Sequence, residues 1–155
     1  MAEHDESYRL LFSNPRMVED LLRGYVREAW VDELDFSTLE PVKTSLVGDR
    51  LQHREADLLW RVAWRGEGRG WLYVYVLIEF QSTVDRWMAL RVLAYVALFY
   101  QELVRHVELT PDGKLPPVLP VLLYNGRRRW QAPREVAELI AEVPGGLAAY
   151  RPRLR

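Results

Sequence analysis

The stretch WLYVYVLIEFQS, from Trp71 to Ser82, predicts the central strand of the fold. It begins as an unbroken run of β-branched, aromatic and aliphatic residues, which is typical of a strand that is covered on both faces. The run ends in Glu79, Phe80 and Gln81, so a carboxylate and a carboxamide stand two residues apart where the strand leaves the core. Side chains two apart on a strand share a face. We expect a central strand with a candidate site at its end.

A second strand is predicted just before it, over ADLLWRVAWR (56–65), with GEGRG (Gly66–Gly70) as the turn of an antiparallel hairpin. Asp57 stands nine residues before Gly66, and Glu79 stands nine residues after Gly70. These equal arms predict that the two carboxylates lie near each other, at the end away from the turn. Their repulsion must be offset by a proton, an arginine or a divalent cation.

The flanking segments predict an α/β domain with helices on both sides of a mixed sheet. Helices are predicted for 6–12, 14–30, 83–108 and 132–143, and further strands for VKTSLV (42–47) and VLPVLLYNG (118–126). Asn14 is the expected N-cap of the second helix, with Pro15 at its first position, and Ser82 or Thr83 caps the long helix. DELDFSTLEP (32–41) is expected to be a connector, and Pro120 favours an edge position for the last strand.

Composition narrows the chemistry of any site. The 155 residues suffice for one domain, so we expect a single domain over 1–155. There is no cysteine, which excludes disulfides, thiol catalysis and thiolate metal sites. The only histidines are His4, His53 and His106. A metal would therefore be held by oxygen ligands, which favours Mg²⁺, Mn²⁺ or Ca²⁺.

Charge is distributed unevenly along the chain. Residues 1–60 carry 7 Lys+Arg against 13 Asp+Glu, whereas residues 61–155 carry 14 against 9. The basic half could face a polyanion, or it could be an ordinary solvated surface. The polar, acidic start MAEHDESYR and the shortness of the apolar stretch VLAYVALFY predict a cytoplasmic protein without a membrane span. The tail PGGLAAYRPRLR has no structural stop, so we expect the N-terminal part of a longer protein.

The paired carboxylates have two open interpretations. A divalent cation held by Asp57 and Glu79 would suit phosphodiester cleavage, because it neutralises phosphate and generates hydroxide from water. Gln81, on the same face as Glu79, would then sit by the attacking water. Alternatively the two acids form structural ion pairs with Arg54, Arg61 or Arg86.

Taken in order, the motifs resemble a known family. They are HDESYRLLFSNPRMVEDLL, READLLWRV, YVLIEFQS followed by DRWMALRVLAYV, and LPPVLPVLLYNG. This set resembles the recombination-promoting nuclease family, also called YhgA-like transposases, from His4 to about Tyr150. The resemblance implies the PD-(D/E)xK nuclease superfamily, with an αβββαβ core and additional N-terminal helices.

The resemblance also implies roles for residues. Asp57 and Glu79 match the superfamily's metal ligands, joined by the backbone carbonyl of Phe80 and by waters. Gln81 replaces the superfamily's catalytic lysine, as is typical of the resembled family, so it can orient water only through hydrogen bonds. His4 and Asp5 match an N-terminal HD motif and are possible accessory residues, although Asp5 is also a plausible helix N-cap.

Arginines near the strand ends are candidate DNA contacts. Arg86 and Arg91 begin the long helix, and Arg127, Arg128 and Arg129 follow the YNG motif. Each could hold a phosphate or be a solvated surface residue. The aromatic residues of the strands and the long helix are expected to pack in the core rather than to stack on bases.

The sequence therefore predicts a Mg²⁺-dependent DNA endonuclease of low sequence specificity, linked to recombination or mobile elements. DNA is the expected partner, and a homodimer is possible. The alternatives are a DNA-binding module that has lost turnover and a dimerising domain whose acids form interchain salt bridges. A glycosidase with paired carboxylates is a remote third.

Overall fold

The computed structural model describes Ser7 and residues 10–43, 58–66, 70–79, 84–142 and 145–153, with only the main chain of Ile78 and Glu79. Ser7, Leu10 and Leu11 are helical. The further elements, in chain order, are α2 (Pro15–Tyr25), η1 (Ala29–Glu33), β1 (Leu34–Pro41), β2 (Leu58–Trp64), β3 (Trp71–Glu79), α4 (Met88–Arg105), β4 (Val118–Tyr124), η3 (Val136–Leu139) and η4 (Gly145–Tyr150).

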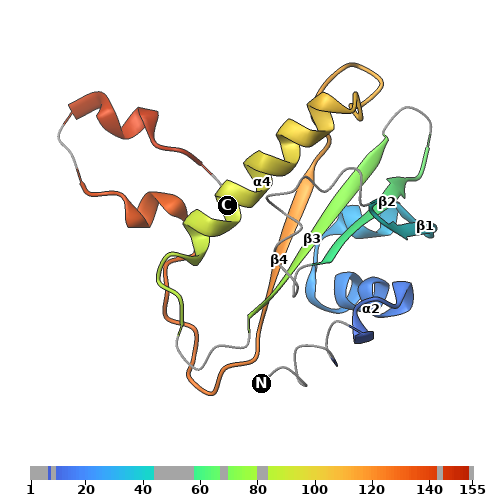
Figure 1. Ribbon diagram of the computed structural model, residues 1–155, viewed down its shortest axis with the longest axis horizontal. Helices are drawn as coiled ribbons and strands as arrows, with labels where there is room; N and C mark the ends of the chain where they lie inside the picture. The colour runs from blue at the N-terminus through green and yellow to red at the C-terminus, as the bar shows by residue number, and fades with distance from the viewer. Residues whose placement is uncertain are drawn as a thin grey trace.

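The four strands form one mixed sheet in the order β1-β2-β3-β4 (Figure 1). β1 and β3 both run antiparallel to β2, whereas β4 runs parallel to β3. The parallel pair is joined through α4, as a crossover connection requires. This arrangement confirms the predicted α/β class, and its order α2, β1, β2, β3, α4, β4 matches the expected αβββαβ sequence.

β3 is covered on both faces, as its sequence predicted. Leu72, Val74 and Val76 face the cluster under α2, whereas Tyr73 belongs to the cluster under α4. β4 alternates in the same way, since Leu119, Val121 and Leu123 pack against the cluster under α2. Pro120 lies on β4, which has only β3 as a neighbour among the described strands, so the predicted edge position is confirmed.

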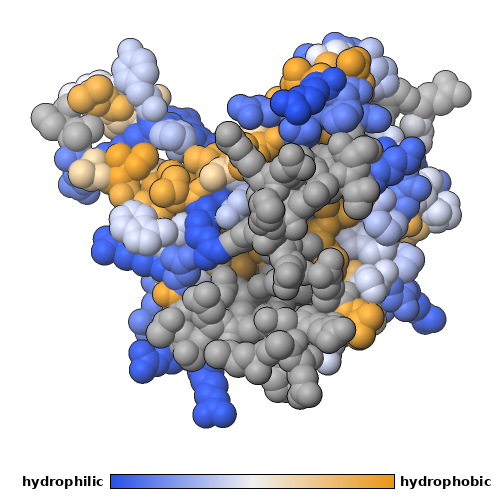
Figure 2. Space-filling view, in the orientation of Figure 1, coloured by the Kyte–Doolittle hydropathy of each residue, from blue (hydrophilic) through white to orange (hydrophobic). Residues whose placement is uncertain are grey.

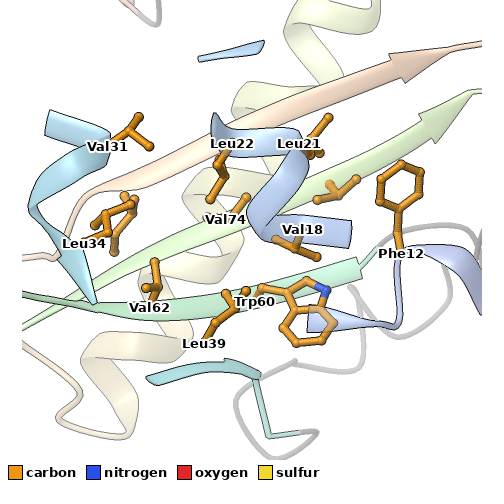
Figure 3. Packing of buried hydrophobic residues seen from close by; sticks show 12 residues of the cluster. Phe12, Val18, Leu21, Leu22, Val31, Leu34, Leu39, Trp60, Val62 and Val74 are labelled. Carbon is orange, nitrogen blue, oxygen red and sulfur yellow. The ribbon is translucent and has the colours of Figure 1, made fainter. Parts of the chain in front are cut away.

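The larger core lies between α2 and the sheet (Figure 3). Val18, Leu21 and Leu22 of α2 pack over Trp60 of β2 and Val74 of β3. Burial of such aliphatic side chains contributes about 1.5–3 kcal/mol each before entropy is counted. The smaller core, built from Val42, Tyr73, Phe99 and Leu103, lies under α4.

The helix boundaries differ in part from the prediction. Asn14 caps α2 and its side chain accepts a hydrogen bond from the Arg16 amide at 3.0 Å, as expected, but α2 ends at Tyr25. α4 begins at Met88 rather than at residue 83. The Asp85 carboxylate accepts a hydrogen bond from the Trp87 amide at 2.8 Å, which holds the preceding residues in a turn. Ser82 and Thr83 lie outside the described residues.

Two predictions about the remaining segments were wrong. The expected connector 32–41 contains β1, because Leu34 and Leu39 supply a buried face while Thr38 and Glu40 interact with β2. Val42 and Lys43 are not in a strand, and the rest of 42–47 lies outside the described residues.

The expected helix 132–143 is reduced to η3. Of the η3 residues only Val136 is buried, and a short helix needs packing to persist.

The hairpin register also differs from the equal-arm count. That count would pair Leu58 with Ile78, but Leu58 pairs with Val76. The Trp64 amide donates to the Gly70 carbonyl at 3.1 Å, so the loop is centred one residue earlier than the sequence suggested. Among the described residues, no helix combines the length and apolar character needed to cross a bilayer.

Candidate active site

The ends of β3 and β4 meet at one edge of the sheet. Their parallel register runs from Tyr73 opposite Val118 to Glu79 opposite Tyr124. Both strands end at the lower side of Figure 1, and the chain after β4 curves from there to η3, which contacts α4. In open α/β sheets, ligands bind beyond the carboxyl ends of such strands. This edge is therefore the candidate active site.

The predicted metal ligands lie only partly within the described chain. The main chain of Glu79 ends β3. Asp57, Phe80 and Gln81 lie outside the described residues, as do the possible accessory residues His4 and Asp5. Within the described ranges, no group of three or more His, Asp or Glu residues could hold a metal ion. The chemistry of the predicted donors, two carboxylates and a carbonyl, suits a hard cation.

An aromatic layer supports β3 on the side toward α4. The rings of Tyr73 and Phe99 meet edge to face at 5.0 Å between centroids. Tyr75 stacks on Tyr95 at 6.4 Å with an interplanar angle of 14°. Trp60, on the opposite side of the sheet, is only 2% exposed. These contacts confirm that the aromatic residues of the strands serve packing.

The YNG motif forms a tight exit from β4. A Cβ added to Gly126 would overlap the hydroxyl and ring of Tyr124, so the Tyr124 ring lies against the glycine backbone. The same ring meets Trp130 edge to face at 5.0 Å. The Tyr124 hydroxyl is buried and has no hydrogen-bond partner in the described part of the chain. The exit from β4 thus depends on a residue without a side chain.

Three arginines follow this exit directly. Arg127, Arg128 and Arg129 are all exposed. None of them forms an ion pair with the residues that the structure describes. Arg128 and Arg129 line a hollow of about 520 Å³ together with Val84 and Gln131. A cationic surface next to the strand ends suits a phosphate backbone.

The two arginines near the start of α4 differ from each other. Arg86 is exposed, and its guanidinium lies 5.2 Å from the centre of the Trp87 ring. Arg91 pairs with Asp85 at 2.5 Å. Arg86 can therefore reach solvent. Arg91, in contrast, uses part of its hydrogen-bonding capacity in the ion pair with Asp85, which lies just before α4.

Arg61 was a possible partner for the strand-end acids, but it is held elsewhere. Its Nε donates to Glu40 at 2.7 Å, and its guanidinium lies 4.2 Å from the centre of the Trp71 ring. Burial acts to lower the pKa of Arg61, but hydrogen bonds with Glu40 and Tyr73 outweigh it and raise that pKa. Arg61 ties β1 to β2 and β3.

An apolar cavity of about 380 Å³ lies beside the strand ends. Its walls come from β3, β4, the first turns of α4 and the segment through η3, and they include Leu77, Met88, Leu122, Tyr124, Trp130 and Arg134. Trp130 and Arg134 were not predicted from the sequence as site residues. The signal was present in YNGRRRW, where aromatic residues flank a basic run.

A family model described as "Putative transposase, YhgA-like" matches residues 2–153. The chain belongs to this YhgA-like family. Two relatives from Escherichia coli are named recombination-promoting nucleases. RpnD from strain O157:H7 is 33% identical over 81% of this chain and 46% of its own length. RpnA from strain K12 is 31% identical over 79% of this chain and 40% of its own length.

A further YhgA-like relative carries a different name. RpnE from strain K12, 30% identical over 81% of this chain and 40% of its own length, is named an inactive recombination-promoting nuclease-like protein. The chain spans less than half the length of these relatives. No solved structure matches it.

Proposed function

We propose that this YhgA-like domain is a metal-dependent DNA endonuclease of low sequence specificity that acts in recombination. One observation carries the proposal. Glu79 ends β3 opposite Tyr124, and the arginines that follow Tyr124 by a few residues have no ion pair within the described chain. A carboxylate at the strand end, next to arginines without an ion pair, is suited to cleavage of the polyanionic DNA backbone.

The expected roles follow from the chemistry of each group. Asp57, Glu79 and the carbonyl of Phe80 would hold Mg²⁺, with Mn²⁺ or Ca²⁺ as alternatives. When bound, such a cation neutralises phosphate charge and acidifies water. Gln81 orients the attacking water by hydrogen bonds, since it carries no charge. Arg127, Arg128, Arg129 and Arg86 position the DNA backbone, and Arg91, which pairs with Asp85, is a further candidate contact.

Low specificity is expected because backbone contacts position DNA without reading its sequence. The relatives' names support nuclease activity in recombination. We expect the domain to act on DNA in the cytoplasm, and a homodimer stays a prediction. The name of RpnE supports a second candidate, a module of the same fold that binds DNA without turnover.

The deciding experiment is nicking of supercoiled plasmid by the purified chain with Mg²⁺, Mn²⁺, Ca²⁺ or EDTA. Asp57→Ala and Glu79→Ala should each lower the nicking rate by roughly 100-fold or more, because lost transition-state charge stabilisation commonly costs that much. Asp20→Ala removes an exposed carboxylate from α2 and should keep the wild-type rate.

Two results would contradict the proposal or favour the second candidate. Nicking that persists in EDTA, or in both strand-end variants, would contradict the metal site. DNA binding without nicking, together with no calorimetric Mg²⁺ binding, would favour the module that binds DNA without turnover.

A further inference from the structure

The apolar cavity beside the strand ends has a chemistry that the proposed cleavage does not use. Its lining is largely apolar and includes Leu77, Met88 and Leu122. Tyr124 and Trp130 place two rings at an interplanar angle of 73° in its wall. Ligand pockets have volumes of about 300–1,000 Å³ and combine such apolar walls with a few polar groups. The cavity is thus large enough for a small flat ligand.

The cavity offers few polar groups to a ligand. Tyr124 carries a buried hydroxyl without a hydrogen-bond partner in the described chain. Buried polar groups are normally paired, but this hydroxyl lies against the backbone of Gly126, so it offers no contact to a ligand in the cavity. Arg134 also lines the cavity, is exposed, and forms no ion pair with any described residue. The Arg134 guanidinium could hydrogen-bond to the edge of a ligand.

One segment joins this cavity to the cationic hollow. Trp130 lines the apolar cavity, while its neighbours Arg128, Arg129 and Gln131 line the hollow of about 520 Å³. Figure 2 shows hydrophobic residues gathered along the C-terminal arm near α4, with hydrophilic residues beside them. The matching ligand has apolar faces, a polar edge and an attached anion. An apolar protein side chain would not use the arginines.

We propose that this cavity receives a single nucleobase, turned out of the DNA strand whose phosphates lie on Arg128 and Arg129. The inference rests on the proposed action on DNA. Trp130 supplies a face for stacking, and Arg134 meets the edge of the base. Stacking on an aromatic ring accepts any base, so the site adds affinity without sequence preference. It also favours single-stranded or unpaired DNA, from which a base is easily displaced.

The test compares two fluorescein-labelled single-stranded oligonucleotides, one ordinary and one with a central abasic tract, by anisotropy in EDTA. The wild-type chain should bind the ordinary strand at least 5-fold more tightly, because each stacked base contributes about 1–3 kcal/mol. Trp130→Ala should reduce ordinary-strand binding to the abasic level and leave abasic-strand binding unchanged. Trp130→Phe should restore most of the difference.

Tyr25→Ala is the matched control, since Tyr25 is an exposed aromatic residue on α2. A second measurement needs no variant. Photo-crosslinking of 5-iododeoxyuridine-substituted single strands to the wild-type chain should attach to Trp130 or Tyr124. Far-ultraviolet circular dichroism checks that the Trp130 variants are folded.

The outcomes separate the two proposals. Equal binding of ordinary and abasic strands, or crosslinks only outside the cavity, would overturn the nucleobase site and leave the endonuclease proposal standing. Equal binding is also the result if the cavity takes a protein side chain instead. No binding of either strand, combined with no plasmid nicking, would overturn both proposals.

Discussion

At the scale of single residues, Tyr73 and Arg61 show how a polar pair is built into a mostly apolar sheet. Tyr73 is 1% exposed and contacts Phe99, while its hydroxyl meets Arg61. Burial raises the pKa of Tyr73, and Arg61 opposes that rise only in part. Glu40 and Glu108 add to the rise through their negative charges. The protonated phenol is therefore the form that the fold stabilises.

This shift predicts a loss of stability in alkaline solution. The folded pKa of Tyr73 lies above its unfolded value of about 10, so its contribution is complete below that pH. Above it, the unfolded chain binds fewer protons than the folded chain, and the free energy of unfolding falls as pH rises. Tyr73→Phe should make this fall shallower between about pH 9.5 and 11, measured by urea unfolding.

Tyr25→Phe should retain the wild-type dependence, because Tyr25 is 83% exposed. At neutral pH, Tyr73→Phe should cost about 0.5–1.5 kcal/mol for the lost hydrogen bond. A Tyr73→Phe profile parallel to the wild-type profile would contradict the assignment of the alkaline transition to this residue.

At the scale of elements, the end of β4 depends on Gly126. The Tyr124 ring occupies the space that a side chain at position 126 would need. Gly126→Ala should therefore displace Tyr124 and lower the free energy of unfolding by about 1–3 kcal/mol, the usual cost of overpacking. The urea midpoint measures this change.

Gly24→Ala is the matched control for Gly126→Ala. Gly24 lies within α2, and a Cβ added there meets nothing within 4 Å. Alanine is a better helix former than glycine, so this variant should gain about 0.5–1 kcal/mol. Equal effects of the two substitutions would show that the close approach of Tyr124 does not constrain the turn.

At the scale of the whole molecule, part of the basic charge in the second half of the sequence can be located in the structure. Arg128 and Arg129 line one hollow next to the ends of β3 and β4. Arg16 and Arg27 are also exposed, but they lie in and just after α2, which packs on the other face of the sheet. Only the first pair should contribute to the proposed DNA surface.

Salt dependence tests this assignment. Arg128→Ala/Arg129→Ala should weaken DNA binding and reduce the slope of log K against log salt by about 1.4–1.8, since each phosphate contact contributes about 0.7–0.9. Arg16→Ala/Arg27→Ala removes equal charge and should leave the slope nearly unchanged. Equal losses in both double variants would indicate a general charge effect instead of a defined surface.

Much of the fold could be predicted because the pattern of apolar residues within a short segment indicates which of its residues are buried. The apolar run of β3, the alternation of β2 and the Asn14-Pro15 cap each carry their signal within a few residues. β1 was missed because its pattern is irregular. Its register shifts between Asp35 and Glu40, so the alternation expected of a strand is interrupted.

The candidate site was predictable in its residue types but not in its surroundings. Glu79 stood out because an acid ends an apolar strand, whereas Trp130 and Arg134 carry no periodic signal. Their position depends on how the segment after β4 returns to α4, and that path was predicted as a longer helix. Asp57 and Gln81 keep their predicted roles as predictions.

The α/β class, the two-sided burial of β3 and the polar strand end each follow from the chemistry of consecutive residues in the sequence. The hairpin register, the partner of Arg61 and the cavity lined by Tyr124, Trp130 and Arg134 are defined only in the folded chain. These features arise where elements distant in sequence meet. Their geometry depends on strand pairing and packing, which no local pattern records.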